Sequence, residues 1–261
     1  ADLRPLGSLL AMVQHHSVDI RDAAGVRGAV QASQPDYVFH LAAAGVTEPF
    51  LAIEEALAIN VLGSIHLFRA CFPASEHQNV RRLVHTGTPY EYGGGTPEEP
   101  APLNPYGASK AAASAVARMY QHTEGWPILT VRPFQVYGPG QPEQTLIPSA
   151  LRAAEAGETF KLTGGAQRRD FVFVDDIVYG YLLAATKGVD GCSYDLGWGR
   201  TCSIKELVLR LYRLLNTTAS PQFGALPYRP GEAWRLQANP TAAARDLGWV
   251  PQIDLDSGLA L

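Results

Sequence analysis

The sequence predicts an α/β protein whose parallel sheet carries helices on both faces. Short apolar segments alternate along the chain with stretches that have apolar residues at helical spacing. One strand-like segment, DYVFHLAAAG at 36–45, is almost entirely apolar, as strands covered on both faces are. The chain has 261 residues and a hydrophobic fraction of 46%, enough for one large domain or for a domain with a smaller lobe.

The first part of the chain has the most regular pattern. We expect a helix at 52–72, where apolar residues recur at helical spacing, and another at 106–122, which is rich in alanine. Strands are expected where apolar runs end in small or turn-forming residues, at DYVFHLAAAG (36–45), RRLVHTG (81–87) and ILTVRPFQVYGPG (128–140).

The pattern loosens after residue 140. We therefore expect a sheet domain over 1–140 and a smaller α/β lobe over 141–261, with segments of the lobe returning to the sheet. The expected elements are a helix at 146–158, a strand at 171–174, a helix after Asp175, a strand at 193–197, and a helix at 203–216 that opens with a capping box from Ser203 to Glu206.

Composition excludes several classes of protein. The formal net charge of −4 gives neither a basic footprint for nucleic acid nor a polybasic patch for membranes. Cys71, Cys192 and Cys202 share no C-x-x-C spacing, so we expect reduced packing residues rather than a disulfide or a metal site. No apolar run approaches the roughly 18 residues of a membrane span, and the opening segment does not resemble a signal peptide. These features predict a cytoplasmic protein.

The sharpest chemical motif is Tyr106-Gly-Ala-Ser-Lys110. Residues four apart lie on one face of a helix, so the phenol and the ammonium can point the same way. A neighbouring cation favours the phenolate and lowers a tyrosine pKa from its usual value of about 10, which suits general acid/base catalysis near neutral pH. The alternative is that Y-x-x-x-K occurs by chance on a surface helix.

Seven segments in order resemble the extended short-chain dehydrogenase/reductase family, which contains nucleotide-sugar epimerases, dehydratases and reductases. The segments are VFHLAA, NVLGSIHLF, TGTPYEYG, NPYGASKAAA, VRPFQVYGPGQ, RRDFVFVDDIV and YRPGE. The resemblance implies a Rossmann-type domain that binds NAD(P) and a C-terminal lobe that binds a nucleoside-diphosphate sugar. It also implies a homodimer, paired through the helices that contain Asn60 and Tyr106.

The resemblance assigns catalytic roles to three residues. Thr88 falls at the family's catalytic Ser/Thr, whose hydroxyl bonds the substrate oxygen. Tyr106 exchanges the proton, and Lys110 also binds the nicotinamide ribose. The residues implied at the cofactor are Asp19, Ile20, Leu41, Ala42, Ala43, Asn60, Thr86, Tyr106, Lys110 and Pro133. Two of these have plain structural alternatives, since Asp19 could cap a helix or lie in a loop and Asn60 could be a satisfied buried amide.

The resemblance also implies residues that bind the nucleotide sugar. Arginine suits a diphosphate because its planar fork makes bidentate contacts. Gln135 stands where the family usually has Asn, and Arg168 is expected to be a solvated neighbour. The residues implied at the substrate are Thr88, Gln135, Ile147, Arg169, Arg229 and Glu232.

One family feature is not found in the sequence, the Gly-rich G-x-x-G-x-x-G phosphate loop that follows the first strand. We expect that the sequence is a fragment, or the ordered part, of a longer chain. The alternative is that the protein has lost this loop and binds dinucleotide poorly. The residue that selects NAD over NADP belongs to the same region, so NAD is the family's default and NADP stays open.

The residues after Thr88 bear on the reaction. In the family's 4,6-dehydratases the catalytic Thr is followed by Asp and Glu, which act as acid and base. Here Pro89 and Tyr90 follow Thr88, and Glu91 is out of register by one position. We therefore expect a nucleotide-sugar 4-epimerase or a related keto-sugar reductase. The alternatives are a dehydratase of the same family and a non-catalytic protein that binds nucleotide sugar or dinucleotide on this fold.

No metal site is predicted. His15, His16 and His40 lack the spacing of zinc ligands. The acidic pair Asp175 and Asp176 is better explained as a helix N-cap followed by a first-turn acid than as a set of metal ligands.

Overall fold

The computed structural model describes residues 7, 9, 11–73, 80–96 and 99–261. Within this described part, the largest sheet has four parallel strands in the order β1-β2-β3-β8. Its strands are β1 (Tyr37–His40), β2 (Arg82–Thr86), β3 (Ile128–Pro133) and β8 (Ser193–Leu196). The predicted α/β class with a parallel sheet is confirmed. Because β8 belongs to the later half of the chain, that half does contribute to the sheet.

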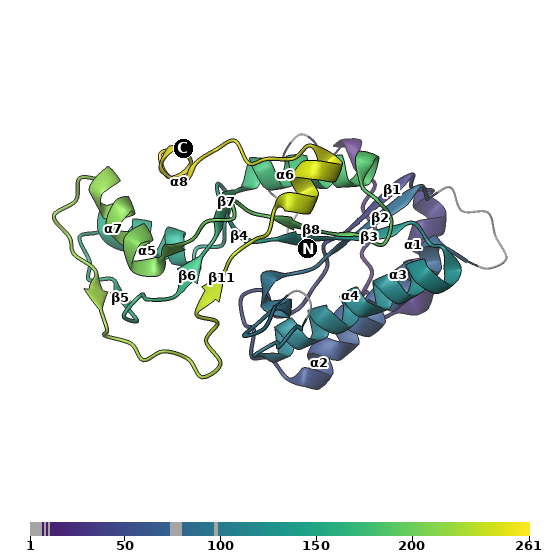
Figure 1. Ribbon diagram of the computed structural model, residues 1–261, viewed down its shortest axis with the longest axis horizontal. Coiled ribbons are helices and arrows are strands. Elements are labelled where there is room, and N and C mark those ends of the chain that lie inside the picture. The colour runs from purple at the N-terminus through teal and green to yellow at the C-terminus, as the bar shows by residue number, and fades with distance from the viewer. Residues whose placement is uncertain (1–6, 8, 10, 74–79, 97–98) are drawn as a thin grey trace.

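Helices cover both faces of the sheet (Figure 1). One face carries α1 (Ala23–Ser33), α3 (Gly63–Cys71) and α4 (Pro105–Glu124), and the other carries α6 (Val174–Lys187). Successive strand residues point to opposite faces. Leu83 accordingly packs in the cluster beneath α1, α3 and α4, while Val84 packs in the cluster beneath α6.

The helix predicted at 52–72 forms as three consecutive segments. They are α2 (Ile53–Leu57), the π-helical turn η2 (Ala58–Leu62) and α3. The backbone stays helical at the junctions, so the π turn is a bulge within one helix rather than a break. The bulge carries Asn60, whose side chain is fully buried.

The smaller lobe lies at the end of the molecule away from α1 (Figure 1). Helices α5 (Leu146–Glu155) and α7 (Ile204–Leu214) pack together over an apolar cluster. The predicted capping box opens α7, with Glu206 N–H donating to Ser203 Oγ at 3.1 Å and Ser203 N–H donating to Glu206 Oε2 at 2.7 Å.

Several short elements complete the chain. Strand β4 pairs in parallel with β7, β10 pairs with β5, and β6 lies between β11 and β9. Their bounds, with those of the short helices, are β4 (Gln135–Tyr137), β5 (Lys161–Leu162), β6 (Arg168–Arg169), β7 (Phe171–Phe173), β9 (Cys202–Ser203), β10 (Gln222–Phe223), β11 (Arg235–Leu236), η3 (Pro89–Glu91), η4 (Ala243–Leu247) and α8 (Leu255–Leu259).

The single strand predicted at 128–140 is wrong, because the chain changes sheets at Phe134. Strand β3 belongs to the main sheet, whereas β4 pairs with β7. The Phe134 N–H donates to Leu196 O at 3.0 Å, and the next N–H, of Gln135, donates to Asp170 O at 2.9 Å. Each backbone donor is satisfied, but by a different neighbouring strand.

The start of α6 also differs from its prediction. The helix begins at Val174, and its N-cap is Phe173, which makes no side-chain capping bond. Asp176 lies in the first turn, as predicted, but Asp175 lies there too and is not the expected N-cap. The buried Asp176 carboxylate accepts the backbone N–H groups of Gln252 and Ile253, each at 3.0 Å. It therefore holds the C-terminal segment against the start of α6.

The remaining exclusions concern the described residues only. All three cysteines are free thiols, as predicted. No cluster of three or more His, Cys, Asp or Glu side chains suited to a metal ion occurs among the described residues. Over the same part of the chain, no helix combines the length and apolar character that crossing a bilayer needs.

Replacing Asp176 by Ala should lower the free energy of unfolding by about 2 kcal/mol or more, since two backbone N–H groups lose their acceptor. Urea denaturation measures this change. The matched control is Asp175→Ala, because Asp175 lies in the same helical turn but is exposed. If both variants lose the same free energy of unfolding, Asp176 stabilises the protein through the helix dipole rather than through its contacts with the C-terminal segment.

Candidate functional site

The predicted site residues gather where the strands of the main sheet end. Parallel strands bring their carboxyl ends to one edge, where ligands bind in open α/β sheets. Leu41, Ala42 and Ala43 follow β1 and are partly or largely exposed. Thr86 ends β2 and its hydroxyl bonds the Tyr181 hydroxyl at 2.8 Å, while Pro133 ends β3.

Thr88 is held at the start of a short helical turn. Its backbone is extended, and it serves as the N-cap of η3. The Tyr90 N–H donates to Thr88 Oγ1 at 3.4 Å, and the Thr88 N–H donates to Glu91 Oε1 at 2.9 Å. Thr88 is buried, with 4% of its surface exposed. The hydroxyl predicted to be catalytic is thus fixed by its own capping box.

Helix α4 begins directly against this turn. Asn104 caps it, with Oδ1 accepting from the Gly107 N–H at 2.8 Å, and Pro105 occupies the first helical position. A Cβ at Gly107 would lie 2.4 Å from the Tyr90 carbonyl oxygen, so only glycine allows this approach. The ring of Tyr106 consequently lies edge-on to that of Tyr90, with 6.1 Å between the centroids.

Burial dominates the ionisation of the tyrosine and the lysine. It raises the pKa of Tyr106 to about 12, an increase that the neighbouring Thr88 hydroxyl offsets only in part. Burial also lowers the pKa of Lys110 to about 8. The sequence predicts that Lys110 lowers the pKa of Tyr106, whereas the pKa moves in the opposite direction. Desolvation disfavours the charged form of both groups and is the largest cause of each shift.

Asn60 connects the loop after β1 to the start of α4. Its Oδ1 accepts from the Ala44 N–H at 2.8 Å, and its Nδ2 donates to Ala44 O at 2.9 Å and to Ser109 Oγ at 2.8 Å. The Ser109 hydroxyl in turn donates to Tyr106 O at 2.9 Å. The alternative of a satisfied buried amide therefore describes Asn60 in this structure, and contact with a cofactor stays a prediction.

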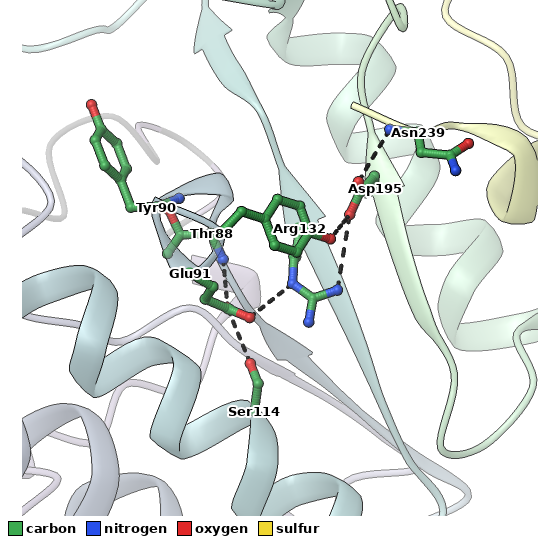
Figure 2. A network of polar contacts seen from close by, with 8 residues as sticks. Thr88, Tyr90, Glu91, Ser114, Arg132, Asp195 and Asn239 are labelled. Carbon is green, nitrogen blue, oxygen red and sulfur yellow. Dashed lines mark hydrogen bonds and ion pairs between the residues drawn. The ribbon is translucent and has the colours of Figure 1, made fainter. Parts of the chain in front are cut away.

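Sequence reasoning missed the importance of Glu91. Its carboxylate is buried and accepts from Arg132 Nε at 2.8 Å, from Ser114 Oγ at 3.0 Å and from the Thr88 N–H (Figure 2). The side chains of Glu91 and Arg132 are only 3% and 9% exposed. The signal available in the sequence was an Arg in an otherwise apolar strand, which requires a buried acceptor.

The network extends from Arg132 into the C-terminal half of the chain (Figure 2). Arg132 Nη1 lies 3.9 Å from Asp195 Oδ1, and its guanidinium stacks 5.2 Å from the centroid of the Tyr92 ring. Asp195 accepts from the Tyr92 hydroxyl at 2.8 Å and from the Asn239 N–H at 3.1 Å. Burial raises the pKa of the Asp195 carboxyl and of the Tyr92 phenol, which favours a hydrogen bond with the phenol protonated.

The structure brings together two of the predicted substrate residues. Arg169 is buried, and its Nη2 donates to Glu232 Oε1 at 2.7 Å while its Nη1 donates to Ala233 O at 2.6 Å. Arg229 lies nearby in sequence and is exposed. Gln135 is half-buried at the start of β4.

Four other positions named from the sequence have structural roles. Ile147 packs in an apolar cluster with Tyr137, Phe171, Phe173 and Leu207. The expectation that Arg168 is merely solvated is wrong, because it donates to Thr201 O at 2.7 Å and Thr201 Oγ1 at 3.1 Å. Asp19 is exposed and pairs with Arg21 through several hydrogen bonds, which lower its pKa to about 2. Ile20 packs against α3 beside Gly63.

Replacing Asn60 by Ala should lower the free energy of unfolding by roughly 2–4 kcal/mol, because buried groups of Ala44 and Ser109 lose their partners. Hydrogen exchange at the Ala44 amide should become faster. Ser109→Ala, which removes only one of the three bonds, provides a graded comparison. An unchanged exchange rate at Ala44 in Asn60→Ala would contradict the assigned role.

Replacing Lys110 by Met should stabilise the protein at neutral pH. A pKa lowered from 10.5 to about 8 means that the folded state binds this proton more weakly than the unfolded state. The resulting penalty, on the order of 3 kcal/mol, is complete below pH 8 and disappears as the pH rises towards 10.5. Urea denaturation at pH 7 and pH 10 measures it, with the exposed Lys187→Met as control. If Lys110→Met is less stable than the parent at pH 7, burial of the Lys110 ammonium does not destabilise the protein as expected.

The chain is similar to known proteins over most of its length. A family model described as NAD dependent epimerase/dehydratase family matches residues 4–197. UDP-glucose 4-epimerase from Mycolicibacterium smegmatis is 32% identical over 259 residues, covering 93% of this chain and 79% of that protein. The crystal structure of UDP-glucose 4-epimerase from Thermotoga maritima with UDP-glucose is similar at a TM-score of 0.84 and 27% identity, covering 94% of this chain and 81% of that one.

A dehydratase is about equally similar. The crystal structure of dTDP-glucose 4,6-dehydratase from Streptomyces venezuelae, which contains NAD, has a TM-score of 0.81 and 30% identity, covering 93% of this chain and 76% of that one. The family model covers well over half of the chain, so the predicted family is confirmed. The chain belongs to the NAD dependent epimerase/dehydratase family.

Proposed function

We propose that this protein catalyses the NAD(P)-dependent 4-epimerisation of a nucleotide sugar, or the closely related reduction of a keto-sugar. The supporting observation is the juxtaposition of Thr88 and Tyr106 at the carboxyl edge of the sheet, with Lys110 one helical turn beyond Tyr106. All three are buried where their surroundings fix their geometry. Such preorganisation is what proton and hydride transfer require.

The residues at this edge fit a dinucleotide. Lys110 is 1% exposed, and within the described part of the chain its ammonium makes no hydrogen bond or ion pair, so its donors suit the hydroxyls of a ribose. The small side chains of Ala42 and Ala43 allow a cofactor to approach the loop after β1. NAD, when bound, supplies the acceptor and donor of hydride. NAD is the proposed cofactor on the family's description, with NADP as the alternative.

Side chains of the protein then transfer one proton to or from the sugar. Tyr106, with a pKa of about 12, is protonated at neutral pH and can donate to the oxygen of a keto-sugar. In the opposite direction, the Lys110 ammonium stabilises the phenolate that takes a proton from the sugar hydroxyl. Thr88 would hydrogen-bond the same substrate oxygen. Epimerisation needs both directions at C4, whereas a reductase needs only the first.

Dehydration is disfavoured by what surrounds Thr88. Pro89 has no acid chemistry and Tyr90 carries no carboxylate. The nearest acid in the sequence, Glu91, is engaged by Arg132, Ser114 and the Thr88 N–H. A carboxylate held in this way is a poor base for removing a carbon-bound proton. This supports an epimerase or reductase over a 4,6-dehydratase.

The proposed substrate is a nucleoside-diphosphate hexose. Gln135, Arg169, Arg229 and Glu232 are the proposed contacts with its nucleotide and diphosphate. UDP-glucose is present in the epimerase structure described above, and dTDP-glucose is in the name of the dehydratase. A panel of UDP- and dTDP-hexoses is therefore the first to test. We also propose a homodimer through α4 and the continuous helix of α2, η2 and α3, whose exposed apolar residues include Ile53, Leu57 and Leu62.

Replacing Tyr106 by Phe should lower turnover at least 1,000-fold while leaving the binding of NAD and of nucleotide sugar nearly unchanged, since only the proton-carrying oxygen is lost. Product NMR measures turnover and calorimetric titration measures binding. The control is Tyr179→Phe, because Tyr179 is exposed on α6.

Two outcomes would argue against the proposal. Full activity in Tyr106→Phe would exclude Tyr106 as the proton carrier. Failure of the complete protein to bind NAD or NADP under any condition would favour the rival function, a non-catalytic protein that binds nucleotide sugar.

A further inference from the structure

The proposed reaction leaves one buried acid beside the catalytic residues without a role. Glu91 lies in η3, three residues after Thr88, and only 3% of its side chain is exposed. We propose that Glu91, held by Arg132, is a positioning residue that fixes the Thr88 hydroxyl and supplies the counter-charge for the Lys110 ammonium. This inference rests on the proposed function.

The first step of the argument is local. The Glu91 carboxylate accepts the Thr88 N–H at 2.9 Å, and the Thr88 Oγ1 accepts the Tyr90 N–H at 3.4 Å. These bonds close a capping box, which fixes both the backbone and the side chain of the residue at its start. The direction of the Thr88 hydroxyl therefore depends on where the Glu91 carboxylate lies.

The second step is what fixes that carboxylate. Besides the Thr88 N–H, it accepts from Ser114 Oγ on α4 and from Arg132 Nε on β3 (Figure 2). A Cβ at Gly87 would lie 2.5 Å from Glu91 Oε1 and 2.8 Å from Arg132 Cγ, so glycine at this position gives the pair its room. Three donors from three elements hold the carboxylate in one place.

The third step connects this arrangement to the rest of the protein. Arg132 also approaches Asp195 on β8, whose carboxylate accepts the Asn239 N–H from the C-terminal half. The position of Thr88 is thereby tied to strands β3 and β8 as well as to its own turn (Figure 2). A hydroxyl mounted in this way is preorganised for its hydrogen bond with substrate.

The fourth step concerns charge. The Glu91 carboxylate accepts from Ser114 Oγ, and Ser114 lies four residues after Lys110 on the same face of α4, so the carboxylate and the ammonium are on one side of that helix. In keeping with this placement, Glu91 raises the pKa of Lys110 against the lowering caused by burial, and it also raises the pKa of Tyr106. The charged or titratable groups that interact with Glu91 are Tyr106 and Lys110 on α4, Arg132 on β3, Asp195 on β8, and Tyr92 at the end of η3. Glu91 thus helps to keep Lys110 an ammonium at neutral pH.

Two substitutions separate the effects of position and charge. Glu91→Gln keeps the size of the side chain and removes its charge, whereas Glu91→Asp keeps the charge and withdraws it by one methylene. The control is Glu143→Gln, which neutralises an acid that also pairs with an arginine, Arg152, but is 85% exposed. The sequence contains four lysines, so the titration of Lys110 can be resolved by NMR of ¹³Cε-lysine and assigned with Lys110→Met.

The lysine titration tests the charge role without cofactor or substrate. In Glu91→Gln the pKa of Lys110 should fall by about one pH unit below that of the parent. In Glu91→Asp and in Glu143→Gln it should stay close to the parent value. An unchanged pKa in a folded Glu91→Gln variant would overturn the charge role. If Glu91→Gln does not fold, the Glu91→Asp variant, which retains the charge, decides the question. A pKa of Lys110 that is lowered in Glu91→Asp would then overturn the charge role.

Kinetics test the positioning role with the nucleotide sugar that the parent turns over best. Glu91→Asp should lower kcat by roughly 10- to 100-fold with KM within about threefold, because Thr88 is displaced from its place in the transition state. Parent-like kcat in Glu91→Asp would overturn the positioning role. Absence of turnover in the parent itself would instead contradict the proposed function, and the lysine titration would still decide the inference on charge.

Discussion

An ion pair between two buried side chains, Glu91 and Arg132, connects the end of β2, the strand β3 and the helix α4. Taking both charges out of water is costly, so the pair adds little net stability compared with an apolar alternative. Removing one partner would nevertheless cost about 3–5 kcal/mol, since the other charge would stay buried alone. The main effect of the ion pair is therefore to hold Thr88 at a fixed position beside Tyr106.

Other parts of the site also contain buried polar or charged groups. The ammonium of Lys110 is buried at a free-energy cost, which its lowered pKa records. Asn60 lies in a π-helical turn, a feature that commonly marks functional sites, and satisfies three buried polar groups at once. The contacts of Glu91 with Arg132 and of Asn60 with Ala44 and Ser109 join segments that are distant in sequence at the carboxyl edge of the sheet. That edge owes its rigidity to these polar contacts as much as to the two apolar cores.

Local chemistry explains what could be predicted from the sequence. The capping box of Ser203 and Glu206 and the apolar strands depend on neighbours in the chain, and the structure has both. The importance of Glu91 depends on Arg132, which lies 41 residues away. An Arg in an apolar strand indicates that a buried acceptor exists, but no local pattern identifies Glu91 as that acceptor. The direction of the Tyr106 pKa shift depends on how deeply the fold buries the phenol, which spacing alone does not report. The change of sheets at Phe134 was likewise decided by partners from distant strands.

The proposed reaction moves a hydride and one proton without eliminating the 6-hydroxyl of the sugar. The most direct measurement is ¹H NMR of the product formed from UDP-glucose or dTDP-glucose with NAD in D₂O. Because Pro89 and Tyr90 carry no carboxylate and Glu91 is held by Arg132, Ser114 and the Thr88 N–H, we expect the product to keep both its C5 hydrogen and its 6-hydroxyl. A 4-keto-6-deoxy product with deuterium at C5 would contradict the proposed function, since 4,6-dehydration exchanges that hydrogen and neither 4-epimerisation nor reduction at C4 does.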